Sequence, residues 1–433
     1  MHRQGRPPKR NRFPPDITAR IIDVLGEGLL DLANLDCLKA LAKCLLVSRT
    51  FCHHSRRHLF RSVRLKDSPQ KTFFDRVALL REIIAPRSNP HSGIISYIKV
   101  FRVDISRQPG PTLYTKKDEG LAIILEAFLL FGSRLEEFNF VGLGVDWHKL
   151  GRTVQERLCS IIRTPSLSVI HLAGLDGVPT SILTGITCKK LSLCRLKTDN
   201  ILHEAASNLE WANIPQLRLE YFNTDNTFPL KYVSSNGPWT DLPNNPTSPF
   251  ACLKKLALKI NSQQHHQESL KVLLGVKSSL QEMEIVLTSN GITAAIDIGQ
   301  FPRLQKLRLQ QQNIDISYIF FPAVIRILNP ATPCISLKQL DLRFTSHYSY
   351  SPTACTPLHR MTVWPRIDAF LSTPQFPSLN RVRLLLDFGI SSGHRRPLAS
   401  TDLLLNEVPR LRESFPMLSY SDSVEFTVEI CGG

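Results

Sequence analysis

The chain has 433 residues, of which 42% are hydrophobic and 21% charged, and this composition excludes a wholly disordered protein. Fifty-three Lys and Arg against 37 Asp and Glu give a net charge of +16, and no apolar run is long enough to span a membrane, so no membrane partner is expected. The ten cysteines are scattered and the basic first twelve residues lead into no apolar core, which favours a cytoplasmic or nuclear protein with reduced thiols over a secreted one.

Residues 1–12 are predicted to be a basic tail, typical either of a solvated terminus or of a nuclear import signal. Three helices are predicted next, over residues 16–25, 37–47 and 50–60. In the first, Ile17, Ile21 and Leu25 are spaced to share one apolar face. Apolar residues outside the main stripes are expected to stay partly exposed, namely Ile22, Cys44, Leu46 and Val47. Such a surface is either a docking face or the side that packs on the following domain.

Residues 13–65 contain three ordered motifs, Phe-Pro-Pro-Asp-Ile at 13–17, Val-Ser-Arg-Thr-Phe at 47–51 and Leu-Phe-Arg-Ser-Val at 59–63. Together these motifs resemble an F-box of the kind abundant in basidiomycete fungi. It implies docking to a Skp-family adaptor, which bridges to a cullin scaffold. The matching positions that would form or support this contact are Pro14, Ile17, Ile21, Leu25, Val47, Ser48 and Phe51. Phe13 and Asp16 replace the usual Leu and Glu, and residues 26–36 lengthen the first loop, so that either Leu35 or Leu38 fills the next apolar position.

An internal repeat follows the helical segment. The pattern apolar-x-x-apolar-x-apolar occurs ten times, beginning at Ile95, Leu135, Leu167, Cys188, Ile214, Leu253, Leu280, Leu304, Leu337 and Leu379. The spacings of 21 to 42 residues leave room for one strand and one return segment, with return helices predicted over 120–131, 154–162, 199–211, 267–275 and 316–328. Alternating residues Val424, Phe426, Val428 and Ile430 predict a final edge strand. Repeated strand–return units predict a parallel sheet in a solenoid.

These repeats resemble leucine-rich repeats, most clearly over residues 167–193. The Asn or Cys that this family places in the turn after each strand occurs cleanly only at Asn261, so the repeats are irregular. The predicted fold class is therefore α/β, with a small three-helix F-box at 13–65 and an irregular leucine-rich-repeat-like solenoid with a parallel sheet at 66–433.

Two long insertions interrupt the array, at residues 223–250 and 345–365. Insertions in solenoids often project from the binding face, and aromatic side chains on loops offer rigid contact area. The candidate target-binding residues are Tyr232, Trp239, Tyr348, Tyr350 and Trp364. The alternative is that these aromatic rings are packed beneath their own loops.

The sequence contains no phosphate-binding loop, zinc-protease motif or nucleophile elbow. The group Cys37, Cys44, Cys52, His53 and His54 lacks the spacing of a structural zinc site. His265 and His266 are predicted to lie on the surface in a polar turn. No metal, cofactor or catalytic residue is expected, and the protein is expected to be non-enzymatic.

The function expected from these features is that of a substrate-recognition subunit of a cullin-type ubiquitin ligase, in which the F-box holds the Skp-family adaptor and the repeats hold a target protein of unknown identity. Surplus arginine on the strand faces would suit acidic or phosphorylated targets. The alternative is a non-ligase repeat scaffold that binds nucleic acid or another acidic partner through its basic surface. That alternative predicts that Ile17, Ile21 and Leu25 are covered by the first repeat. Of its two possible partners, nucleic acid is the less expected. A third hypothesis is a hydrolase or transferase built on an α/β scaffold.

Overall fold

The computed structural model describes residues 14–27, 35–84, 93–105, 119–132, 134–199, 217–228, 248–288, 296–312, 322–346, 358–388 and 401–432. The chain divides into two compact units, Met1–Ser168 and Val169–Gly433. This division falls within the predicted repeat domain, because the predicted helical domain and the first strands share one unit. The basic tail at 1–12 lies outside the described residues.

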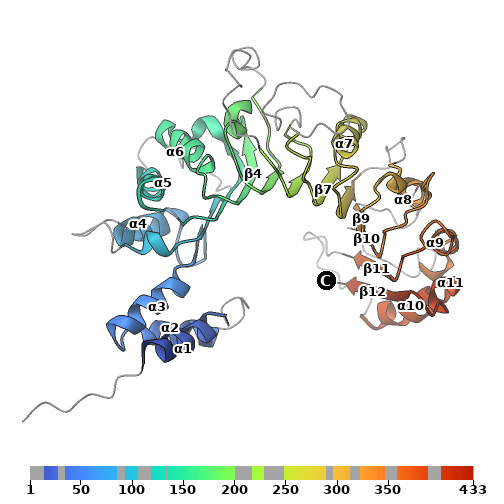
Figure 1. Cartoon of the computed structure of the whole chain (residues 1–433), viewed down its shortest axis with the longest axis horizontal. Helices are drawn as coiled ribbons and strands as arrows, with labels where there is room; N and C mark the ends of the chain where they lie inside the picture. The colour runs from blue at the N-terminus through green and yellow to red at the C-terminus, as the bar shows by residue number, and fades with distance from the viewer. Residues whose placement is uncertain are drawn as a thin grey trace, which may run out of the picture. The chain divides into compact units, whose positions relative to one another are not determined.

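Three helices open the first unit: α1 (Pro15–Glu27), α2 (Leu35–Cys44) and α3 (Arg49–Leu59) (Figure 1). All three predicted helices are confirmed. Pro15 suits the first turn of α1 because a backbone donor has no partner there, and Asp16 favours the positive end of the helix dipole. Helix α2 ends three residues earlier than predicted, because a turn at 45–47 leads into Ser48, whose side chain caps α3.

The strands of the first unit are β1 (Ser62–Lys66), β2 (Val100–Ile105) and β3 (Glu137–Asp146), which pair in parallel in sequence order. The return segments are α4 (Phe73–Ile84), η2 (Ile94–Tyr97), α5 (Glu119–Phe131), η3 (Trp147–Lys149) and α6 (Arg152–Ile162). The predicted helices 120–131 and 154–162 are thereby confirmed.

The sequence pattern misplaces the start of this sheet. The triplet that lies in register with the later strands is Ile98, Phe101 and Val103, three residues beyond the predicted one, and all three side chains are fully buried. Strand β1 is a further departure from the predicted pattern, although Phe60, Val63 and Leu65 have the same spacing. The segment that closes the F-box-like motif is therefore also the first strand of the repeats.

The second unit contains nine described strands, again parallel and in sequence order. They are β4 (Val169–Asp176), β5 (Lys190–Cys194), β6 (Tyr221–Thr224), β7 (Lys255–Ile260), β8 (Glu282–Leu287), β9 (Lys306–Gln312), β10 (Gln339–Ser346), β11 (Arg381–Phe388) and β12 (Glu425–Gly432). The last strand confirms the predicted terminal edge strand.

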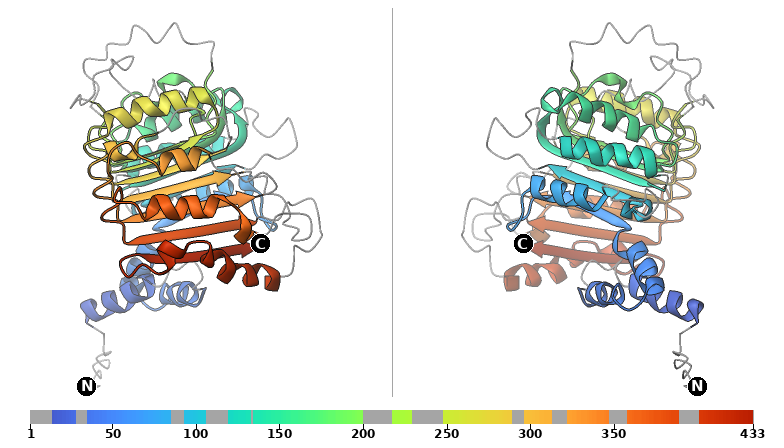
Figure 2. Two further views of the ribbon diagram at one scale, coloured as in Figure 1. Left: turned by 90° about the vertical axis from the view of Figure 1, so that its right-hand side faces the viewer. Right: turned by 90° about the vertical axis from the view of Figure 1, so that its left-hand side faces the viewer.

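Helices and short turns return the chain between these strands. They are η4 (Thr180–Leu183), α7 (Gln263–Gly275), η9 (Ile298–Gln300), α8 (Pro322–Ile327), η11 (Leu358–Arg360), α9 (Val363–Leu371), α10 (Thr401–Glu413) and α11 (Pro416–Ser419). The strands of this unit run side by side, with α7, α8 and α9 on one face of the sheet (Figure 2). The predicted helix 199–211 lies almost wholly outside the described residues.

Alternation along each strand separates the core from the exposed face. In β9, Leu307 and Leu309 are buried, whereas Lys306 and Arg308 lie on the opposite face. The same side-chain alternation recurs at matching positions from strand to strand, because neighbouring strands pair in register. These features confirm the predicted α/β fold class with a parallel-sheet solenoid.

Strand β6 departs from the predicted pattern. Its register with β5 places Leu219, Phe222 and Thr224 at the positions expected for Ile214, Leu217 and Leu219. A buried asparagine follows this strand: the side-chain amide of Asn226 donates to the Lys259 carbonyl at 3.1 Å and to Ser269 Oγ at 3.0 Å. Asn226 has a φ of 59°, which asparagine tolerates better than most residues. Predicted Asn261 instead accepts a hydrogen bond from the Thr288 hydroxyl at 2.6 Å.

His266 is a second departure from the sequence prediction. It lies in α7 with no exposed surface, and so the predicted surface position is wrong. The periodicity of α7 explains the error, because His266, Ser269 and Leu273 share the buried side of the helix, although the first half of its sequence is polar. Neither ring nitrogen of His266 has a hydrogen-bond partner among the described residues, and burial lowers the pKa of the ring.

We expect this histidine to make the second unit sensitive to mild acid. Because the pKa of His266 is lowered by folding, the unfolded chain binds a proton below about pH 6.5 that the folded chain does not. The free energy of unfolding is therefore unaffected by this group above that pH. Below that pH it decreases by at most about 1.4 kcal/mol per pH unit. Denaturant midpoints at pH 7.5 and 5.5 should differ less in His266→Leu than in the wild type. The exposed control His148→Gln should keep the full difference.

Candidate functional site

Helix α1 carries apolar side chains on two sides. Its inner side holds Thr18 and Ile22, which are buried against a core that also contains Leu41 of α2. Its outer side carries Ile17, Ile21 and Val24, which are 48%, 43% and 53% exposed. The prediction that Ile22 stays partly exposed is therefore wrong: the spacing of residues 18 and 22 places Ile22 on the side that faces α2 and α3.

More apolar side chains are exposed on the same helical segment. In α2 they are Leu35 and Leu38, and in the turn before α3 they are Leu46 and Val47, which are 89% and 64% exposed. Together, Ile17, Ile21, Val24, Leu35, Leu38, Leu46 and Val47 are called the outer apolar set below. Leu35 and Leu38, the two candidates for the next apolar position of the motif, are both exposed. The buried contact of α2 comes from Leu41 instead. Seven large apolar side chains exposed within about thirty residues make this segment the candidate docking site.

The capping of α3 positions the end of this set. Ser48 Oγ accepts a hydrogen bond from the Phe51 backbone amide at 3.3 Å, which ends the turn and begins the helix. Leu46, Ser48 and Cys52 also border a shallow hollow of about 370 Å³ next to Tyr97. Ser48 therefore holds Leu46 and Val47 outward by shaping the backbone.

The remaining candidate positions are less exposed or lie at the margin. Pro14 is exposed directly before α1, and its carbonyl accepts a hydrogen bond from the Thr18 amide at 3.1 Å. Leu25 and Phe51 are half-buried. These three positions can support the helices as well as touch a partner.

Three residues that the sequence reasoning missed join α1 to α3. His58 Nε2 lies 2.7 Å from Asp23 Oδ1. Gly26 lies against the same ring, where a Cβ atom would stand 2.0 Å from His58 Nδ1. The absence of a side chain at Gly26 therefore allows α1 and α3 to approach closely, and the His–Asp contact fixes their alignment. A glycine followed by a long loop reads only as a helix stop in the sequence.

Of the five candidate target-binding aromatics, the structure describes one. Tyr232, Trp239, Tyr348 and Tyr350 lie outside the described residues. Trp364 is fully buried in α9, with its ring centroid 5.8 Å from those of both Phe344 and Phe415. The prediction of a surface anchor at Trp364 is therefore wrong, because the indole fills the core between α9, β10 and the end of α10.

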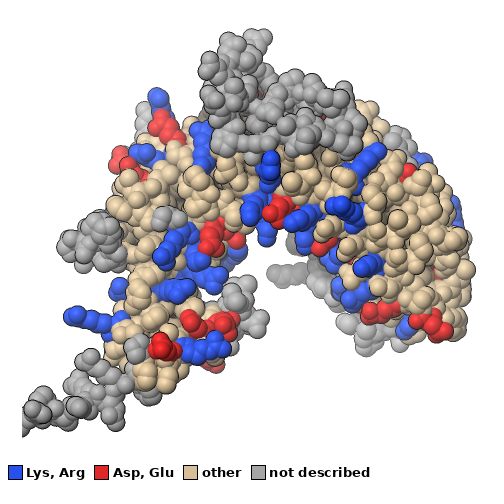
Figure 3. All heavy atoms as spheres, viewed as in Figure 1, with Lys and Arg blue, Asp and Glu red and all other residues tan. Residues whose placement is uncertain are grey.

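Ion pairs cover the exposed face of the strands. In the second unit, Arg308 lies 3.1 Å from Glu284 and 3.5 Å from Asp341 on the neighbouring strands. Further cross-strand pairs are Arg64–Asp104, Arg102–Glu137, Lys255–Glu282, Arg343–Asp387 and Arg383–Glu429. Acidic side chains therefore lie among the basic ones on this face (Figure 3). The expected surplus of arginine on the strand faces is not found at these positions, because the arginines are already paired.

Within the part of the chain that the structure describes, no group of three or more His, Cys, Asp and Glu residues is placed to hold a metal ion. None of its helices is long and apolar enough to cross a membrane. Cys37, Cys44 and Cys52 are half-buried cysteines in α2 and α3 and form no disulfide with another described residue.

No family model matches the sequence, and no significant match is found among curated proteins. Among solved structures, the chain is similar to one in the crystal structure of the Rad7 and Elc1 complex in yeast, at 16% sequence identity and a TM-score of 0.34. The alignment covers 89% of this chain and 92% of that chain. A likeness at this score assigns no function.

Proposed function

We propose that this chain is the substrate-recognition subunit of a cullin-type ubiquitin ligase. In this proposal the α1–α3 segment docks a Skp-family adaptor, the adaptor bridges to the cullin, and the solenoid captures a target protein in the cytoplasm or nucleus. The chain itself is not catalytic. Its contribution is to hold the target near a ligase-bound ubiquitin carrier, which raises the effective concentration of the target's lysines.

The observation that carries the proposal is the two-sided helix α1. A helix of an isolated bundle needs one apolar side, and Ile22 already supplies it. The second side carries Ile17 and Ile21, which keep 48% and 43% of their surface exposed within the described unit. These are two of the positions that match the F-box motif, and Val47 of the outer apolar set is a third.

The same observation counts against the non-ligase scaffold. That alternative requires Ile17, Ile21 and Leu25 to be covered by the first repeat, but Ile17 and Ile21 remain nearly half exposed. Glu284, Asp341 and Glu429 also lie beside arginines of the strand faces, where their charges oppose a nucleic-acid backbone.

A binding assay with a matched control tests the proposal. Purified full-length chain is titrated with recombinant Skp-family adaptor, beside the double variant Ile17→Asp/Ile21→Asp. We expect saturable binding by the wild type and a loss of at least about 100-fold in the variant, because two carboxylates would have to be buried in an apolar interface. The control is Leu79→Asp/Ile83→Asp in α4, which has the same spacing, charge change and similar exposure (41% and 52%).

The control should bind the adaptor like the wild type. Equal binding by the wild type and the Ile17→Asp/Ile21→Asp variant, or no binding by a folded wild-type chain, would contradict the proposal. Circular dichroism of each variant distinguishes lost binding from lost folding.

A further inference from the structure

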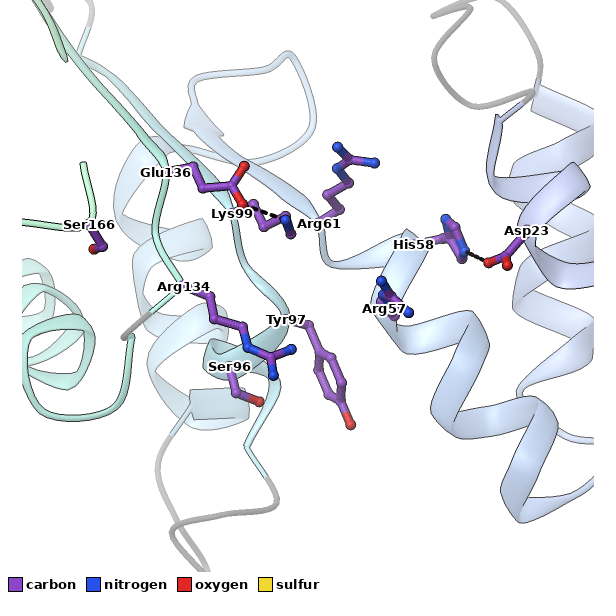
Figure 4. A pocket seen from close by; sticks show the side chains of 10 residues that line it. All are labelled: Asp23, Arg57, His58, Arg61, Ser96, Tyr97, Lys99, Arg134, Glu136 and Ser166. Atoms are coloured by element: carbon purple, nitrogen blue, oxygen red, sulfur yellow. Dashed lines mark hydrogen bonds and ion pairs between the residues drawn. The ribbon is translucent and has the colours of Figure 1, made fainter. Parts of the chain in front are cut away.

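A hollow of about 620 Å³ lies in the first unit between the α1–α3 segment and the ends of the first strands. Its lining includes the charged residues Asp23, Arg57, Arg61, Lys99, Arg134 and Glu136 (Figure 4). Parallel pairing places Arg61, Lys99 and Glu136 at equivalent positions directly before β1, β2 and β3. Neighbouring strands are about 4.8 Å apart, so these three residues form a row along one edge of the sheet.

The charges of this pocket do not balance. His58 is bonded to Asp23, and Lys99 forms an ion pair with Glu136. Arg57, Arg61 and Arg134 are exposed and form no ion pair or side-chain hydrogen bond with the described residues. The lining thus has four Arg or Lys side chains against two carboxylates, and its three unpaired charges are all arginines. This contrasts with the strand face, where the arginines are paired.

We propose that this pocket binds an acidic peptide segment, with Arg57, Arg61 and Arg134 holding an anionic side chain of that peptide. Arginine presents its donors in a planar fork that fits a carboxylate or a phosphoryl group with two parallel hydrogen bonds. Arg57 comes from α3, Arg61 from the link to β1, and Arg134 from the segment before β3, so three different elements bring these arginines to the lining of one pocket. In Figure 4 Arg134 reaches toward Ser96 and Tyr97.

The remaining lining favours a peptide over a nucleic acid. A nucleic-acid backbone carries a charge at every nucleotide and is bound by an extended basic track. Here Asp23 and Glu136 lie in the same pocket, where they would repel a continuous row of phosphates. The same carboxylates, with side chains 43% and 51% exposed, can accept hydrogen bonds from peptide amides. The inference goes beyond the proposed function, because this binding requires neither adaptor nor cullin.

The test uses the purified full-length chain alone, at physiological ionic strength, with three fluorescein-labelled nonapeptides of Gly and Ala. Their central residues are three Glu, one phosphoserine, or three Gln. We expect saturable binding of the glutamate or phosphoserine peptide, whichever source the site prefers, and at least ten-fold weaker binding of the glutamine peptide. Arg61→Gln/Arg134→Gln should lower the affinity for the preferred peptide at least ten-fold. The affinity of Arg61→Lys/Arg134→Lys should lie between those of the wild type and the glutamine variant, because lysine keeps the positive charge but lacks the planar fork of donors.

The matched control removes the same charge from exposed arginines of the second unit, in Arg218→Gln/Arg303→Gln, and should bind like the wild type. Equal weakening in the pocket variant and this control would reduce the effect to general surface charge and overturn the proposal. Equal binding of all three peptides would overturn it too. A ten-nucleotide single-stranded RNA is the last competitor. If it binds more tightly than either acidic peptide, and if the pocket variant loses this binding, the pocket is a nucleic-acid site and the proposal is overturned.

Discussion

Replacing Ile22 with Asp is expected to unfold the α1–α3 segment, whereas replacing Ile17 five residues earlier is expected to leave it folded. Ile22 has no exposed surface, so an aspartate there would be buried without a partner. Ile17 is 48% exposed, and an aspartate there stays in water. A segment of about fifty residues is stabilised by only a few kcal/mol, which a buried unpaired carboxylate is able to cancel.

Hydrogen–deuterium exchange of the full-length chain, followed in peptides from α1, α2 and α3, measures this difference. Ile22→Asp should expose the amides of all three helices, and Ile17→Asp should leave their protection unchanged. Normal protection in Ile22→Asp would mean that the inner side of α1 is not the core. The comparison also supports the adaptor experiment, because it separates the residues that hold the helices from those offered to a partner.

Truncating Trp364 to alanine should destabilise the second unit by about 3–5 kcal/mol. The indole is fully buried and belongs to a chain of aromatic contacts that runs from Phe344 through Trp364 and Phe415 to Phe426. Removing it leaves a cavity between α9 and the strands that the remaining rings do not fill. Next to it, buried Asp368 accepts hydrogen bonds from the Met417 and Leu418 amides at 2.9 Å, so movement of α9 would also disturb the start of α11.

Denaturant unfolding followed by circular dichroism and by amide exchange in β10–β12 measures the loss. Tyr420→Ala is the control, since Tyr420 is 86% exposed and its removal should change stability by less than about 0.5 kcal/mol. A loss below about 1 kcal/mol in Trp364→Ala, together with weaker capture of a target, would restore Trp364 as a recognition residue.

Periodicity in the sequence was enough to predict the architecture. Eight of the ten predicted repeats, all except those that begin at Ile95 and Ile214, have their apolar triplet at the buried positions of a strand. Such positions can be recognised in the sequence because apolar and polar residues alternate along each strand. The errors fall where another apolar residue lies a few positions away. Ile95 competes with Ile98 before β2, and Leu217 competes with Leu219 before β6, so only the pairing with neighbouring strands decides the register.

The candidate site shows the same limit. The sequence alone determined that three helices precede a parallel-sheet solenoid, and it identified Ile17, Ile21 and Val47 as positions of interest, because local spacing and motif order are properties of neighbouring residues. Only the tertiary structure decided that Ile22 faces inward, that His266 and Trp364 are buried, and that the strand-face arginines have acidic partners. It alone brought Arg57, Arg61 and Arg134 to one pocket. Burial and ion pairing depend on contacts between residues far apart in the chain, and a one-dimensional pattern contains no information about which distant side chains meet.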